Sequence, residues 1–253
     1  MKNSQYLIIF CFLSLLLTND FENAVNFYNN RAEGAQGIIA NAKNIDKAIE
    51  LFKKSLKDKE IELESVIYLI KSYYYKGAYV YSNNEDKKKI FNEGKVFAEQ
   101  YFKKFPDSVA IRYWYLVNLG KWSESYGKIA AAREGVADTM KEESEKIIQM
   151  DSEYSDGGGY FMLGAVHYKS PWIPFLLTWP NNNEAIKFLK LAVNTGQSRL
   201  VQKNYLANAL NKSGNKSEAK KILEEVANSI PSVDFLVEDR KEILDAQELL
   251  NAL

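Results

Sequence analysis

The sequence predicts an all-α protein in which helical hairpins stack as a right-handed solenoid, with about five helix pairs and a C-terminal capping helix. Apolar residues follow a helical period almost throughout beyond residue 20, and one stretch contains a complete helix pair. The 5 Pro and 13 Gly residues are too few for a turn-rich β protein or a disordered chain. With 253 residues, 46% of them hydrophobic, the chain is long and apolar enough for a continuous core.

The complete helix pair lies between Lys203 and Pro231. Its apolar residues recur at the i,i+3 and i,i+4 steps of a helix stripe: Leu206, Ala207 and Leu210 in the first helix, and Ala219, Leu223 and Val226 in the second. Gly214 stands at the turn, and Pro231 ends the pair because proline cannot continue a helix. This register resembles the tetratricopeptide repeat, a 34-residue helix pair.

Weaker copies of the pattern predict the other pairs. Ala32, Ala35 and Ile39, followed by Ala48, Phe52 and Ser55, indicate a first pair. The next helices are expected near residues 63–79 and 94–106, with the polar segment 82–89 lengthening their turn, and near 110–120 and 130–150. A further pair is expected near residues 160–167 and from Ala185 onward. After the complete pair, a capping helix is expected at 237–250. Gly157–Gly159 is expected to be either a hinge or a tight turn into the following helix.

The N-terminus has the pattern of an export signal. Lys2 precedes the apolar run Leu7–Leu17, which is too short to span a bilayer but suits the core of a signal peptide. We therefore expect residues 1–20 to be a signal peptide or an uncleaved anchor, and residues 21–253 to be a single helical-repeat domain. The expected location is the periplasm or the cell envelope. Cys11, the one cysteine, lies inside the apolar run and is interpreted as a hydrophobic residue.

Five segments in order, residues 68–80, 90–108, 112–122, 126–154 and 157–180, resemble the TRAP-transporter T-component proteins, and the helical layout is also similar to the regulator-of-microtubule-dynamics family. The first resemblance implies a periplasmic accessory protein, trimers with apolar pores, and a solute-binding protein as partner. T-component proteins are often lipoproteins. Phe10 precedes Cys11 where a lipidation signal needs a small residue, so this chain departs from that pattern.

Signatures of enzymes are missing from the sequence. It contains one histidine, His167, and no GxSxG, HExxH or phosphate-binding glycine loop. We therefore expect no catalysis, no metal and no cofactor, and we interpret His167 as a partly buried residue hydrogen-bonded to a neighbour. Lys and Arg together number 33, as do Asp and Glu, so no excess of positive charge points to nucleic acid.

The candidate binding residues are aromatic and proline side chains. Nine residues are inserted between the helix expected at 160–167 and the helix that begins near Ala185. They lie within Ser170–Pro180, and this loop is unusually apolar. Such a loop either folds back onto its domain or serves binding. The residues expected to bind a ligand or partner are Trp172, Pro174, Phe175 and Trp179, with Trp114 as a further candidate.

The sequence thus predicts an exported, non-enzymatic binding or adaptor protein. Its partner would be a protein such as a solute-binding protein, a small apolar ligand could occupy a groove or pore, and the chain could form a homo-oligomer. The alternative is a general scaffold for envelope assembly that binds peptide segments in its concave groove.

Overall fold

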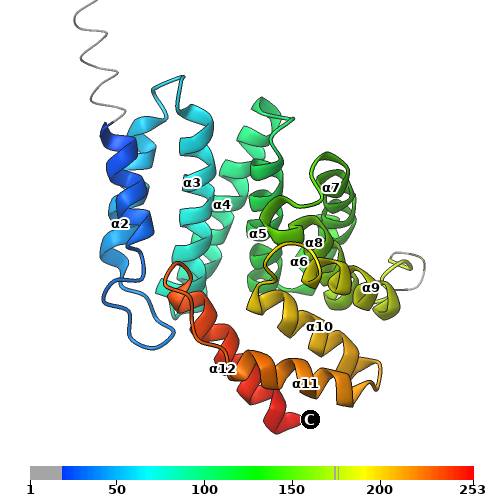
Figure 1. The fold of residues 1–253 in the computed structure, drawn as a ribbon. Coiled ribbons are helices and arrows are strands. Elements are labelled where there is room, and N and C mark those ends of the chain that lie inside the picture. Colours follow the sequence, from blue (N-terminus) through cyan, green and yellow to red (C-terminus); the bar gives the residue numbers. More distant parts are fainter. Residues whose placement is uncertain (1–18, 174, 176) are drawn as a thin grey trace, which may run out of the picture. The chain divides into compact units, whose positions relative to one another are not determined.

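A computed structural model describes residues 19–173, 175 and 177–253 (Figure 1). Helices and loops account for this part of the chain, with two isolated bridges, at Gln36 and Ile39 and at Ile173 and Leu177. The all-α fold of tetratricopeptide-like hairpins is therefore confirmed. The chain forms two compact units, one that ends at Ser125 and one that begins at Tyr126.

The first unit contains the first helix pairs. Residues 19–29 are helical, and they are followed by α2 (Ala42–Ser55), α3 (Glu62–Tyr75), the π-helical turn η1 (Lys76–Val80), α4 (Asn84–Lys104) and α5 (Val109–Tyr126). Helix α3 packs against α2 and α4. In α2 the side chains of Ala48 and Phe52 are completely buried, four residues apart on the stripe that the sequence predicts.

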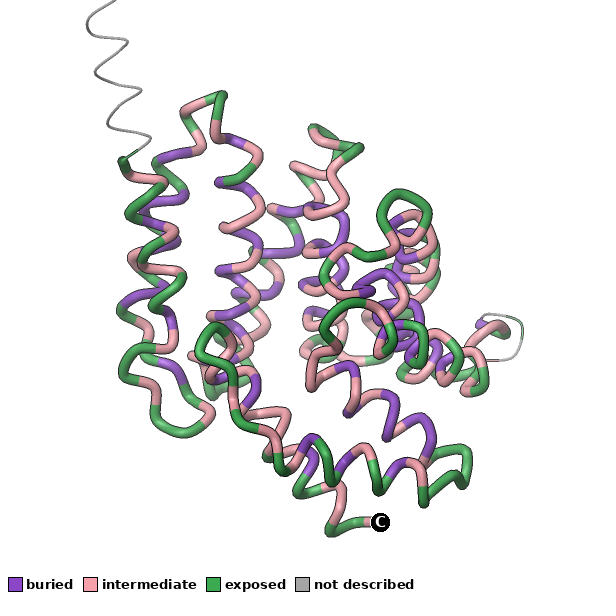
Figure 2. Tube along the Cα trace, in the orientation of Figure 1, coloured by how far each residue is buried: buried purple, intermediate pink, exposed green. Residues whose placement is uncertain are grey.

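The second unit contains α6 (Lys128–Arg133), α7 (Val136–Met150), α8 (Tyr154–Lys169), α9 (Asn182–Val193), α10 (Leu200–Lys212), α11 (Lys216–Ala227) and α12 (Leu236–Ala252). Successive helices from α7 to α12 pack against each other. Gly164 permits the close approach of α8 and α9, since a Cβ atom there would lie 2.7 Å from Leu189 Cγ. In helices such as α7, α9 and α11 the buried positions follow one side, as an amphipathic stack requires, whereas α8 is buried almost all round (Figure 2).

The last helix pair and the cap are as predicted. Gly214 adopts φ +86° between α10 and α11, a conformation that favours glycine. Ala219 of α11 and Ala246 of α12 are fully buried, so small side chains bring these helices into close contact. The first residues assigned to α8 contain a tight turn, because Ser155, Asp156 and Gly157 have left-handed backbone angles. This turn lies inside the second unit, so of the two expected alternatives the structure has the tight turn and not a hinge between units.

Three sequence predictions were wrong in detail. The first helix is residues 19–29, and Ala32 and Ala35 lie in turns, because Gly34 and Gly37 adopt φ +72° and +59° and interrupt the helix. The polar segment 82–89 mostly belongs to α4, which begins where the Asn83 side chain accepts a hydrogen bond from the backbone N–H of Asp86 at 2.8 Å. The helix expected at 130–150 is divided at residues 134–135.

The predicted export signal falls almost entirely outside the described residues, since the description begins at residue 19. The boundary near residue 20 and the cleavage of the segment therefore stay predictions. Among the helices that the structure describes, none combines the length and the apolar character needed to cross a membrane.

Candidate functional site

The insert between α8 and α9 folds as a short hairpin. Ile173 and Leu177 exchange two backbone hydrogen bonds, each 2.8 Å long from N to O. Phe175, at the tip between them, has φ +63°, a left-handed conformation that is unusual for a residue other than glycine. We call residues 170–180 the aromatic hairpin.

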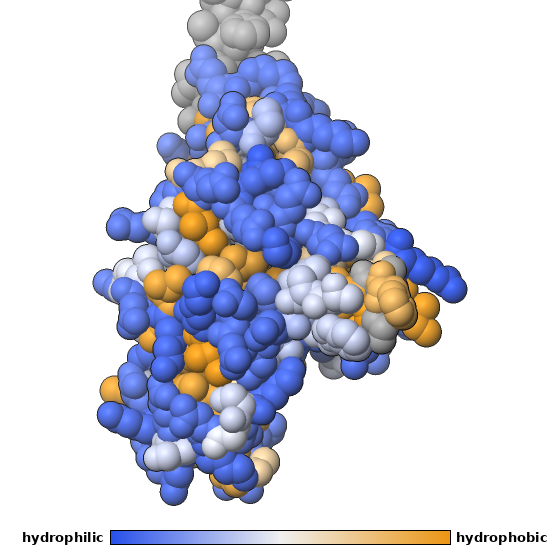
Figure 3. Space-filling model, turned by 90° about the vertical axis from the view of Figure 1, so that its right-hand side faces the viewer, coloured by the Kyte–Doolittle hydropathy of each residue, from blue (hydrophilic) through white to orange (hydrophobic). Residues whose placement is uncertain are grey.

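The tip of the aromatic hairpin is open to solvent. Phe175 is fully exposed and Trp172 is 60% exposed, whereas Leu177 is buried. The side of the molecule that carries this hairpin faces the viewer in Figure 3, where apolar side chains, in orange, reach the surface. Pro174, the fourth predicted binding residue of this loop, lies outside the described residues.

The base of the hairpin is anchored by Trp179. Its indole Nε1 donates a hydrogen bond of 2.7 Å to Oδ1 of Asp138 on α7. The same ring meets the imidazole of His167 on α8 edge to face, with centroids 4.9 Å apart, and Lys141 Nζ lies 6.0 Å from its centroid. Trp179 is half-buried, so it serves as an attachment to α7 and α8 rather than as part of the open tip.

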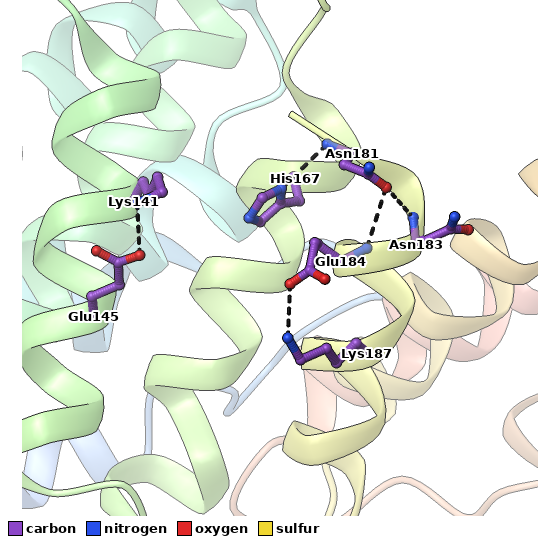
Figure 4. Close-up of polar contacts among 7 residues, drawn as sticks. All are labelled: Lys141, Glu145, His167, Asn181, Asn183, Glu184 and Lys187. Carbon is purple, nitrogen blue, oxygen red and sulfur yellow. Dashed lines mark hydrogen bonds and ion pairs between the residues drawn. The ribbon is translucent and has the colours of Figure 1, made fainter. Parts of the chain in front are cut away.

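His167 holds the next residues of the loop (Figure 4). Its Nδ1 accepts a hydrogen bond of 3.2 Å from the backbone N–H of Asn181, so the imidazole is neutral and carries its proton on Nε2. Burial lowers the pKa of His167; of the nearby charges, those of Glu184 and Glu145 raise it and those of Lys141 and Lys187 lower it. The interpretation of His167 as a buried, hydrogen-bonded residue is confirmed.

The hairpin leads directly into α9. The side-chain oxygen of Asn181 accepts hydrogen bonds from the backbone N–H groups of Asn183, at 2.7 Å, and Glu184, at 3.4 Å (Figure 4). Such a cap fixes the start of the helix. The hairpin is therefore held by Trp179 and by Asn181, while Trp172 and Phe175 make no comparable attachment to the described part of the chain.

Trp114 belongs to the first unit, on α5. Its half-buried ring lies 5.8 Å from the ring of Tyr74 and 5.4 Å from that of Tyr113. The ammonium group of Lys71 lies 5.5 Å from its centroid. Thus the hairpin residues Trp172, Phe175 and Trp179 share one loop, and Trp114 is part of a different aromatic group that includes a lysine.

Sequence reasoning missed Asp138 and Lys71. Asp138 lies 41 residues before its partner Trp179, and no sequence pattern connects them. Lys71 had a recognisable signal, because it is the single charged residue within the stretch 66–75. Within the described part of the chain, no three His, Cys, Asp or Glu residues come together as metal ligands. The arrangement of aromatic side chains offers surfaces for contact.

Comparison with solved structures supports the fold through one match above a TM-score of 0.5. A thermophilic TPR protein of Thermus thermophilus, TTC0263, matches with a TM-score of 0.60 and 13% identity over 93% of this chain and 97% of that one. MamA matches with a TM-score of 0.45 and 16% identity over 84% of this chain and 94% of that one. No family model and no curated protein matches the sequence significantly. The likeness to TTC0263 confirms the tetratricopeptide fold, and the narrower T-component resemblance stays a prediction.

Proposed function

We propose that this protein is a non-enzymatic adaptor that binds a protein partner through the tip of the aromatic hairpin. The observation that carries the proposal is the division of the hairpin into an attached base and an open tip. Exposed aromatic side chains dominate many protein interfaces, because each one buries a large apolar area on contact. Phe175 and Trp172 would supply this contact.

The attached base favours binding. A free loop loses conformational entropy when a partner orders it, and this loss weakens the complex. Here the bridge between Ile173 and Leu177 and the Trp179 hydrogen bond already restrict the loop. The partner would then meet a hairpin whose base is fixed before contact.

We further propose a class of partner and a cellular location for this protein. The N-terminal apolar run and the resemblance to T-component proteins support an exported protein whose partner is a solute-binding protein of a periplasmic transporter. Homo-oligomers with an apolar pore belong to the same proposal. General binding of envelope-assembly proteins is the alternative that the same experiment tests.

The test is site-specific photocrosslinking in the host cell. The tagged, full-length protein carries p-benzoylphenylalanine at position 175, and captured proteins are identified by mass spectrometry. The matched control carries the same group at Ile230, which is 91% exposed in the loop after α11 of the same unit. We expect one dominant adduct at position 175 that is missing at position 230.

Each outcome is informative. A solute-binding protein as the dominant adduct supports the transporter role, and an envelope-assembly protein supports the scaffold. An adduct between two copies of the chain shows that the tip is an oligomer contact. Equal capture from positions 175 and 230, or no adduct at all, would overturn the hairpin as the contact site.

A further inference from the structure

A row of aromatic rings with two cations in contact with them lies in the first unit. We call it the Lys71 cluster, and its members are Tyr28, Arg31, Tyr68, Lys71, Tyr74 and Trp114. The ammonium group of Lys71 lies 5.0 Å from the ring centroid of Tyr68 and 5.5 Å from that of Trp114. The Tyr68 ring continues the row to Tyr28 at 5.2 Å, and the guanidinium of Arg31 lies 4.8 Å from the Tyr28 ring.

The cluster is built on helices and is partly open. Tyr28 belongs to the helix of residues 19–29, Tyr68 and Lys71 to α3, and Trp114 to α5. These rings and the lysine are all half-buried, whereas the neighbouring Tyr75 is fully buried beneath them against Arg31. The row is therefore partly accessible to solvent at its rings and at Lys71.

Lys71 has no carboxylate partner among the described residues, and the only charge acting on it there is the positive charge of Arg31. The segment 1–18 contains neither Asp nor Glu. Burial, followed by the charge of Arg31, lowers the pKa of Lys71 below its ordinary value of 10.5. The cluster is thus a place of positive charge within a chain whose total charge is balanced.

Lys76, five residues after Lys71, differs from it by having a carboxylate partner. It too lies beside an aromatic ring, 5.2 Å from the centroid of Tyr81, but its ammonium also pairs with Asp46 at 2.6 Å. Its pKa is raised, although burial acts against this, because hydrogen bonds to Asp46 and Tyr81 favour the charged form. Lys95 and Lys104, which also contact rings, have the carboxylate partners Glu99 and Glu62.

A half-buried lysine without a carboxylate partner has an unfavourable desolvation free energy when it packs between two rings. Methionine or leucine would fill the same space without desolvating a charge, and the contact with the ring faces offsets only part of that loss. A ligand that brings its own negative charge would remove the penalty and add a charge-assisted hydrogen bond.

We propose that the Lys71 cluster binds a carboxylate of an extended peptide, with the ammonium of Lys71 on the carboxylate and the rings of Tyr68, Tyr74 and Trp114 against the flanking apolar side chains. The row of rings crosses three helical segments, which suits an extended chain better than a small acid. Two cations are too few for nucleic acid, whose affinity depends on many phosphate contacts. This site is independent of the aromatic hairpin.

The experiment is a selection from a random decapeptide library with free C-termini, using the full chain as bait. The best binder is then synthesised in three forms: with its acidic side chains and a free C-terminus, with Asp and Glu replaced by Asn and Gln, and with an amidated C-terminus. Loss of binding in the second or third form tells whether a side chain or the C-terminus supplies the carboxylate. Lys71→Met, Lys71→Arg and the matched control Lys76→Met are measured by fluorescence anisotropy.

We expect Lys71→Met to weaken binding about 10- to 100-fold, the range of one charge-assisted hydrogen bond, with partial rescue by Lys71→Arg and little change in Lys76→Met. A folded Lys71→Met protein, shown by its circular dichroism spectrum, makes this loss specific. Binders that lack a carboxylate, no binders at all, or equal losses in the Lys71 and Lys76 variants would overturn the proposal.

Discussion

The aromatic hairpin and the Lys71 cluster both expose aromatic rings, but they hold them in different ways. The hairpin is a loop in which one aromatic residue, Trp179, is attached while two others, Trp172 and Phe175, are open. In the Lys71 cluster the rings stand on helices, and the same side chains that pack against each other also reach the surface. The hairpin tip carries no charge, whereas the cluster carries an ammonium group without a carboxylate partner among the described residues.

This difference separates two ways of building a binding surface. In the hairpin, anchoring and contact belong to different residues, so a substitution can remove one without the other. In the cluster the two roles fall on the same residues, and the cations, Lys71 above all, are the members that can be changed without removing a ring. The hairpin therefore suits tests of stability against binding, and the cluster suits tests of charge.

The largest expected effect is that of Trp179→Ala. This change removes the hydrogen bond to Asp138 and the ring contact with His167, so we expect the free energy of unfolding to fall by about 2 kcal/mol, below the range for a fully buried tryptophan. Chemical denaturation measures the loss, and hydrogen exchange of the Ile173 and Leu177 amides reports on the bridge.

Trp172→Ala is the matched control for that prediction, because it removes an indole from the same hairpin at an exposed position. We expect a change within about 0.5 kcal/mol. Equal losses in the two variants would mean that the tip is also packed, and the contrast between base and tip would be wrong.

A smaller effect is expected from pH at the hairpin base. Because the folded-state pKa of His167 is lowered, its contribution to stability is complete above the ordinary value of 6.5 and is lost as pH falls from there toward the folded-state pKa. We expect denaturation midpoints to decrease over this interval, by less than the effect of Trp179→Ala. His167 is the single histidine of the chain, so His167→Phe should remove most of the slope between about pH 7 and pH 5.5.

Sequence patterns predicted the second half of the fold better than the first. In residues 200–252 the apolar spacing, Gly214 and Pro231 all indicate the same helix boundaries, and the structure follows them. Near residue 35 the apolar spacing and the glycine positions indicate different structures. Ala32, Ala35 and Ile39 have helical spacing, but Gly34 and Gly37 adopt left-handed angles, and the glycines determine the outcome. A spacing pattern predicts a helix only where no residue between its members prevents one.

The candidate sites show a further limit. Apolar bulk in residues 170–180 indicated a loop that folds back or binds, but the division between Trp179 and the tip depends on Asp138 and His167, which come from other helices. The sequence prediction did not include Lys71; it is the one charged residue of the stretch 66–75, but its lack of a carboxylate partner among the described residues can be seen only in three dimensions. Lys76, so near in sequence, has its partner Asp46 on α2.

The smallest expected effect compares these two lysines in the absence of ligand. Replacing Lys71 by Met removes a desolvated charge, so the free energy of unfolding should stay the same or rise by a few tenths of a kcal/mol. Lys76→Met breaks the ion pair with Asp46, so the free energy of unfolding should fall by up to about 1 kcal/mol. The pH profiles should differ as well. Since the pKa of Lys71 is lowered, its protonation opposes folding at neutral pH, and stability recovers as pH rises through the folded-state pKa toward 10.5.

For Lys76, whose pKa is raised, the stabilisation is complete below 10.5 and is lost as pH rises through the folded-state pKa. Denaturation measured on both sides of pH 10.5 therefore distinguishes the two residues: Lys71→Met should remove a rising component of the stability curve below pH 10.5, and Lys76→Met a falling component above it. A destabilised Lys71→Met protein at neutral pH would show that the ammonium group stabilises the folded state by itself. The cluster would then need no acidic ligand to account for its charge.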